Sequence, residues 1–211
     1  MDLIEMTFGR RRAFSLIEVK HLIISWLVIG LAFSIAISRP FNINYLWPFL
    51  EVFMISLLTI GAGFIGHELT HKFVAQRYGC LAEFRMWPLG LILALFFALF
   101  LGVVFAAPGA VYIVPSSFGL GSFITNRENG IISLSGPLAN FLFAIIFFIL
   151  TFYEGLLYKI GFIGFFINFF LAAFNMIPFP PMDGYKVFIW NKVIWAIVAI
   201  PLWIIVLILM Y

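Results

Sequence analysis

Residues 47–76 read WPFLEVFMISLLTIGAGFIGHELTHKFVAQ, an almost uninterrupted apolar block that carries two histidines near its end. As a helix with a rise of about 1.5 Å per residue, a block of this length exceeds the hydrocarbon core of a bilayer, which is about 30 Å thick. Of the 211 residues, 64% are hydrophobic and only 10% are charged, a balance that a water-exposed globular surface does not tolerate. We therefore expect the block to be one transmembrane helix of a polytopic membrane protein.

Five further apolar blocks lie on either side of it. Hydropathy places them near residues 22–38, 88–107, 131–153, 158–176 and 192–211. The predicted fold class is an all-α polytopic membrane protein with five or six transmembrane helices. The first block is too long for the core of a signal peptide, and no small-residue cleavage site follows it, so we expect it to be retained as a span.

The charged residues and the cysteine count exclude several functions. The formal net charge of +3 comes from lysines and arginines gathered at the ends of the apolar blocks. This distribution suits orientation in a lipid bilayer, and no nucleic-acid partner is expected. Cys80 is the only cysteine, which excludes an internal disulfide and a zinc site built from cysteines.

The orientation depends on the path of residues 88–130. If all six blocks cross and the N-terminus is cytoplasmic, eight of the 12 lysines and arginines lie in the cytoplasm and four outside. If residues 88–130 instead re-enter on the same side, bending at Ala107-Pro108-Gly109, the split becomes ten against two. The positive-inside rule favours the re-entrant path, with a cytoplasmic N-terminus. A continuous crossing at residues 88–107 remains the alternative.

The strongest chemical signal is the H-E-x-x-H motif at residues 67–71. Positions i and i+4 share one face of a helix, so His67 and His71 can offer ring nitrogens to one metal ion. Glu68 lies one step around the helix, close enough to contact a metal-bound water as a general base. The alternative is a pair of packed neutral histidines beside a stray glutamate, which is costly at membrane depth.

A catalytic zinc of this type needs a third protein ligand. Glu51 lies 16 residues before His67 on the same helix, about 24 Å away. The other glutamates are expected in termini or loops, and Asp2 lies in the polar N-terminal tail. Asp183 is the best remaining candidate, because residues 175–184, NMIPFPPMDG, cannot continue a helix and can form a ligand loop. The alternative for Asp183 is an ordinary interfacial loop.

A further polar segment, SGPLAN at residues 135–140, opens the fourth apolar block. Ser135 can cap a helix whose first turn tolerates Pro137, and Gly136 permits close helix packing. Packing alone explains Gly136 and Pro137. Asn140 is harder to explain in this way, because its amide points into apolar surroundings.

Together, the H-E-L-T-H, G-P-L-A-N and N-to-D-G signatures resemble the site-2 protease family of intramembrane zinc metalloproteases, over roughly residues 47–190. The resemblance implies that His67, His71 and Asp183 bind one zinc ion per chain and that Glu68 is the catalytic base. It also implies that Asn140 and Asn175 line the active site and bind substrate or an oxyanion. In that family a three-helix catalytic core holds the zinc-motif helix and the aspartate helix parallel, which agrees with a re-entrant segment at residues 88–130.

The expected organisation is a single membrane-embedded peptidase domain over residues 1–211. Residues 1–46 would form the N-terminal tail and first span, residues 47–190 the catalytic core and residues 191–211 the last span. The expected partner is a transmembrane protein substrate, cleaved near the cytoplasmic face of the cell membrane. The sequence leaves the oligomeric state open. Two rival functions are a proteolytically inactive zinc-binding membrane scaffold and a small ion or proton transporter.

Overall fold

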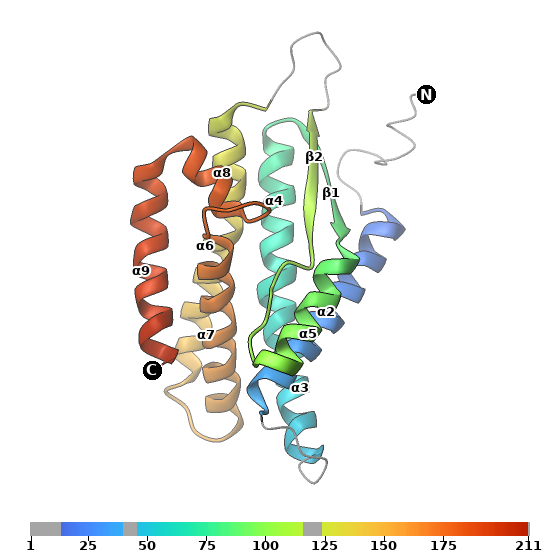
Figure 1. Ribbon diagram of the computed structural model, residues 1–211, viewed down its shortest axis with the longest axis vertical. Helices are drawn as coiled ribbons and strands as arrows, with labels where there is room; N and C mark the ends of the chain where they lie inside the picture. Colours follow the sequence, from blue (N-terminus) through green and yellow to red (C-terminus); the bar gives the residue numbers. More distant parts are fainter. Residues whose placement is uncertain (1–13, 40–45, 116–123, 211) are drawn as a thin grey trace.

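The chain forms a mostly helical bundle in the computed structural model, which describes residues 14–39, 46–115 and 124–210 (Figure 1). Four helical segments are long and apolar enough to span a membrane. They are α2 (Leu16–Ile37), the continuous segment Leu46–Arg77, α6 (Asn126–Leu150) and α7 (Leu156–Asn175). Two shorter apolar helices, α5 (Pro88–Leu101) and α9 (Lys192–Met210), occupy the other two predicted blocks. The expectation of a helical polytopic membrane protein is confirmed.

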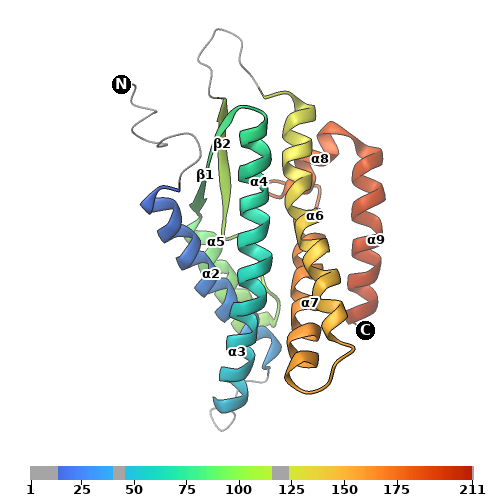
Figure 2. The same ribbon diagram turned by 180° about the vertical axis from the view of Figure 1, so that it is seen from behind.

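The segment Leu46–Arg77 runs through the middle of the bundle (Figure 2). It comprises α3 (Leu46–Ile60), a π-helical turn η2 (Gly61–Ile65) and α4 (Gly66–Arg77). Helix α4 packs against α6, which in turn packs against α7 and against the short helix α8 (Asp183–Trp190). On the other side, α2 packs against α3 and α5. The H-E-x-x-H motif is therefore enclosed by helices that are distant in the sequence.

A small two-stranded sheet follows α4 and was not part of the all-α expectation. Strand β1 (Cys80–Met86) pairs antiparallel with β2 (Gly109–Pro115), in a register that joins Cys80 to Pro115 and Met86 to Gly109. The chain between the strands therefore leaves and returns at the same end of the sheet, as the re-entrant path requires. The bend lies earlier than expected. Helix α5 stops at Gly102, whose φ of 71° is readily adopted only by glycine, and residues 103–108 lead back along α5 to β2.

The N-cap of helix α6 lies ten residues before the predicted cap at Ser135. Thr125 is its N-cap and forms a capping box with Glu128, which satisfies the first free backbone N–H groups. Ser135 therefore lies inside the helix, where its hydroxyl donates to the Ile132 carbonyl at 2.6 Å. Pro137 is also internal to the helix. The apolar pattern alone placed the start too late, because the first turns of α6 are polar.

Three glutamates expected in termini or loops lie in regular elements instead. Glu18 is in α2, Glu83 in β1 and Glu128 in the first turn of α6. Glu18 and Glu83 are buried, with 1% and 2% of their surfaces exposed. Glu18 accepts a hydrogen bond from the Phe84 backbone N–H and pairs with Lys72, so both of its oxygens have partners. The first turn of α2 is thus bound to α4 and β1 by a buried ion pair and a hydrogen bond.

Candidate metal centre

The two motif histidines lie one helical turn apart on α4, directly after the π-helical turn η2. Their rings stand nearly perpendicular, with centroids 4.5 Å apart. His67 and His71 are buried, with 4% and 5% of their surfaces exposed. π-Helical turns are rare and recur at functional sites.

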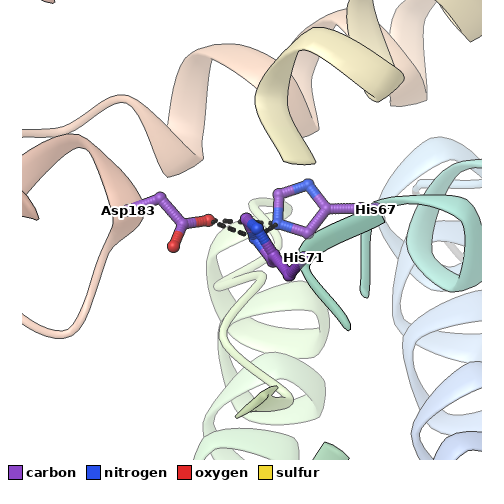
Figure 3. Close-up of side chains that lie close together, drawn as sticks. All are labelled: His67, His71 and Asp183. Carbon is purple, nitrogen blue, oxygen red and sulfur yellow. Dashed lines mark hydrogen bonds and ion pairs between the residues drawn. The ribbon is translucent and has the colours of Figure 1, made fainter. Parts of the chain in front are cut away.

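Asp183 approaches this pair from the first turn of α8, more than 110 residues later in the chain (Figure 3). Its Oδ2 atom lies 3.1 Å from His67 Nε2 and 2.9 Å from His71 Nε2, and the two Nε2 atoms are 2.9 Å apart. Atoms bound to one tetrahedral zinc at about 2.0–2.2 Å lie about 3.3–3.5 Å from one another. The three atoms therefore converge as a ligand set for one metal ion would.

The partners of the other ring nitrogens determine the tautomers of both histidines. His71 Nδ1 lies 2.7 Å from the Ile132 carbonyl oxygen, which can only accept, so Nδ1 must carry the proton. Asn140 Nδ2 donates to the Gly63 carbonyl, so Asn140 turns its Oδ1 toward His67 Nδ1, 2.6 Å away. His67 Nδ1 must therefore donate as well. Each neutral ring then presents the lone pair of Nε2 to the centre of the site.

These tautomers place two lone pairs and a carboxylate oxygen within 3.1 Å of one another, an arrangement that repels unless a cation lies between them. A cavity of about 40 Å³ adjoins the three side chains, which exceeds the volume that one water needs. The donor set of two imidazoles and one carboxylate suits zinc. The residues present thus fit a metal ion with an open coordination position.

Gly136 makes room for the metal position. A Cβ atom on Gly136 would lie 2.5 Å from His71 Nε2 and 2.6 Å from His67 Nε2. Any side chain there would occupy the space between the two rings. The close helix packing expected of this glycine is therefore packing of α6 directly onto the ligand atoms.

Asn140 lines the larger cavity beside the metal centre and is also bonded to one of the ligands. It is fully buried, its Oδ1 accepts from His67, and its Nδ2 donates to Gly63 at 3.1 Å and to Asn168 Oδ1 at 3.3 Å. The Asn140 amide thus fixes the orientation of the His67 ring. Gly63 allows this close approach, since a Cβ atom there would lie 2.2 Å from Asn168 Oδ1.

Glu68 and Asn175 lie where the metal cavity meets a second cavity of about 470 Å³. Both side chains line both cavities. Glu68 Oε2 is buried and has no hydrogen-bond partner among the described residues, so it is available to a water or a substrate. Asn175 donates to the Leu171 carbonyl of its own helix at 3.1 Å. The larger cavity is also lined by both strands of the sheet, by α2 and by the proline loop before Asp183.

The Asp183 carboxylate also faces a cation on its own helix. Lys186 Nζ lies 3.6 Å from Oδ1, the oxygen that does not face the histidines. Lys186 therefore orients the carboxylate so that Oδ2 points into the site.

Sequence reasoning missed two residues of this centre, Asn168 and Lys186. Asn168 is fully buried and joins Asn140 to the carbonyls of Thr59 and Gly164. Its signal was present, because it is an amide in the middle of an apolar helix, seven residues before Asn175 on the same helical face. Lys186 follows Asp183 by one helical turn, a spacing that predicts an ion pair once α8 is assigned.

A search of characterised proteins finds one close relative of the chain. The protein comes from Methanocaldococcus jannaschii and is named "Putative zinc metalloprotease MJ0611"; the two are 50% identical over 192 residues, which cover 90% of this chain and 92% of the relative. No family model matches the sequence, and no solved structure matches it.

Proposed function

We propose that this chain, which belongs to the same protein family as the Methanocaldococcus jannaschii relative, is an intramembrane zinc metalloprotease of the site-2 protease type. The observation that carries the proposal is the convergence of His67, His71 and Asp183 on one point, with Glu68 beside it at the junction of two cavities. One zinc ion per chain would be held by these three side chains. The three sequence signatures support the relation to site-2 proteases.

The proposed reaction is hydrolysis of a peptide bond. Zinc bound at this site would supply Lewis-acid chemistry, making a water more acidic and polarising the scissile carbonyl. Glu68 accepts the proton from the attacking water and then gives a proton to the leaving amine. His67 and His71 keep their Nε2 lone pairs directed to the site through Asn140 and the Ile132 carbonyl. Asn175 is the residue placed to donate a hydrogen bond to the developing oxyanion, since it lines both cavities.

The proposed substrate is the transmembrane segment of another protein. It is supported by the four helices long enough to span a membrane and by the larger cavity, which His67 and Glu68 line. Intact helices shield their peptide bonds, so the substrate must be extended where it is cut. In the described part of the chain, β2 pairs only with β1, and its residues line both cavities, so β2 offers a free edge for an extended peptide.

The proposed orientation places the N-terminus and the metal end of α4 on the cytoplasmic side of the cell membrane. It is supported by the charge distribution of ten lysines and arginines against two for a re-entrant path. The pairing of Cys80 with Pro115 is consistent with that path. Cleavage would then release fragments on the cytoplasmic side.

The two rival functions explain less of the geometry. A metal-binding scaffold accounts for the three ligands but gives no role to Glu68, whose buried Oε2 has no partner among the described residues. A proton or ion transporter accounts for intramembrane charge but not for two histidines whose Nδ1 atoms are both fixed as donors.

The test compares purified wild-type protein with Glu68→Gln and His67→Ala. Wild type should hold about one zinc per chain and cleave a helical membrane substrate in liposomes. Glu68→Gln should keep the zinc and lose cleavage, whereas His67→Ala should lose both. Cleavage by Glu68→Gln would contradict the assigned base, and wild type without bound zinc would contradict the metal site.

A further inference from the structure

A third, apolar cavity lies next to the cavity of about 470 Å³ (the metal-side cavity). It has a volume of about 290 Å³ and is lined by α2, α7 and the segment that follows α5, namely Phe33, Ala36, Gly102, Val104, Phe162 and Phe166 among others. Among the residues that the structure describes, no polar side chain lines it. Val103 and Phe162, at its mouth, are 47% and 54% exposed, so it opens to the surface of the bundle that faces lipid.

The two cavities follow one another along the same helices. On α2, Ile29 lines the metal-side cavity and Phe33 the apolar one; on α7, Leu171 and Phe170 divide in the same way. Four residues of helix correspond to a rise of about 6 Å. An extended chain advances about 3.3 Å per residue, so a substrate bound at the metal centre reaches the apolar cavity within a few residues.

Four phenylalanines linked by ring contacts lie at the boundary between residues that line the two cavities. Phe33 on α2 meets Phe170 on α7 edge to face, with ring centroids 5.9 Å apart. Phe105, between α5 and β2, meets Phe174 on α7 edge to face at 5.6 Å. Phe170 and Phe174 also stack on each other at 5.8 Å. The segment 103–108 carries the boundary itself, because Val104 lines the apolar cavity and Ala106 lines the metal-side cavity.

We propose that these four phenylalanines (the aromatic partition) are displaced by the substrate, and that the apolar cavity receives a large apolar side chain of its transmembrane segment. This inference rests on the proposed function. The cavity exceeds the volume of one aromatic side chain but is too small for a whole helix, which is about 10 Å across. Each edge-to-face pair contributes only about 0.5–1.5 kcal/mol beyond its buried area, so a substrate can exchange these contacts for its own.

The location of the apolar cavity indicates that its occupant is the transmembrane segment of the substrate. The apolar cavity continues the metal-side cavity toward the Ile37 end of α2 and the Phe162 end of α7, away from the loop that carries Asp183. In the proposed orientation this direction leads deeper into the membrane. The part of a transmembrane substrate that stays in the bilayer must therefore pass the apolar cavity when its scissile bond reaches the metal.

The first experiment fills the cavity in the full-length, zinc-loaded protein with Ala36→Phe and uses Ile23→Phe, on the exposed face of α2, as its control. Two substrates share one scissile sequence: a complete transmembrane protein and a short peptide that ends before the apolar cavity. Ala36→Phe should lower kcat/KM for the transmembrane substrate at least tenfold while leaving that for the peptide and the zinc content unchanged. Equal loss on both substrates, or on neither, would overturn the inference; loss on neither is what occupation of the cavity by a lipid acyl chain alone predicts.

The second experiment locks the partition. Phe105→Cys and Phe174→Cys are combined with Cys80→Ala, which removes the only native thiol, and joined with a bifunctional thiol reagent that fluoresces after both thiols react. Cross-linking should lower cleavage of the transmembrane substrate at least fivefold and spare the peptide, and the two single-cysteine proteins treated alike are the controls. Undiminished cleavage by the cross-linked protein would overturn the inference. Failure of the proposed function is seen separately, as wild-type protein that cleaves neither substrate.

Discussion

Lys72, the residue directly after His71, is ion-paired with Glu18 on α2 in the interior of the protein, where their side chains are 2% and 1% exposed. Glu18 also accepts from the backbone N–H of Phe84 in β1. One carboxylate therefore joins the first spanning helix, the metal-binding helix and the sheet beside the metal centre. Burying both charges together is tolerable because each satisfies the other.

Removing only one of these charges should destabilise the protein strongly. Lys72→Met leaves the Glu18 carboxylate buried without a cation, which costs about 3–5 kcal/mol. The double variant Lys72→Met with Glu18→Gln should recover part of that loss, because no unpaired charge remains. Thermal unfolding in detergent, followed by circular dichroism, measures the difference.

The pair Lys159–Glu51 provides the control, because its side chains are 54% and 41% exposed. Lys159→Met should change the free energy of unfolding by less than about 1 kcal/mol. Equal stability of Lys72→Met and Lys159→Met would show that the buried ion pair contributes no more to the free energy of unfolding than the exposed pair does.

Asn140→Ala should weaken zinc binding while leaving all three ligands in place. The substitution removes the acceptor that fixes His67 Nδ1, and loss of such a partner typically costs about 10–100-fold in metal affinity. Competition with a chromogenic chelator measures the affinity. Asn175→Ala is the matched control, because Asn175 bonds only to Leu171 of its own helix among the described residues and should keep wild-type affinity. An unchanged affinity in Asn140→Ala would refute the positioning role.

Gly136→Ala should prevent metal binding by occupying its place. The added methyl group would lie within 2.6 Å of both Nε2 atoms, so the variant should retain less than about a tenth of the wild-type zinc. Leu138→Ala, on the exposed side of the same helix, should retain it fully. Metal content is measured by inductively coupled plasma mass spectrometry, and a fully loaded Gly136→Ala protein would contradict the geometry.

Chelation should separate structure from catalysis. Removing zinc from wild type should abolish cleavage and lower the unfolding temperature, since an ion present at about 100 times its dissociation constant adds about 2.7 kcal/mol of stability. Glu68→Gln should show the same fall in unfolding temperature although it is inactive from the start. If chelation left the unfolding temperature of both proteins unchanged, the ion would not be bound by the folded bundle.

The features that could be predicted from the sequence are those that depend on local sequence patterns. Apolar blocks gave the helices, and the i and i+4 spacing gave His67 and His71. Asp183 followed from elimination, because so few acids were available. All three side chains meet in the structure.

The unpredicted part depends on contacts between distant segments. The strands β1 and β2 lie more than 20 residues apart on either side of an apolar helix. The sequence therefore has no hairpin turn that would predict their pairing. The bonds of Asn140 to His67, Gly63 and Asn168 were not predicted, because these partners come from two other helical segments. The start of α6 was missed because its first turns are polar and its capping box precedes the apolar pattern.

The separation of Asp183 from His71 by 112 residues has a consequence for biosynthesis. Chains are made from the N-terminus onward, so both histidines enter the membrane well before the aspartate leaves the ribosome. Until then the centre has only two of its three ligands and no α8 to cover it. The metal centre is therefore incomplete during most of the synthesis of the chain, and the ion can be bound by all three ligands only once α8 has been made.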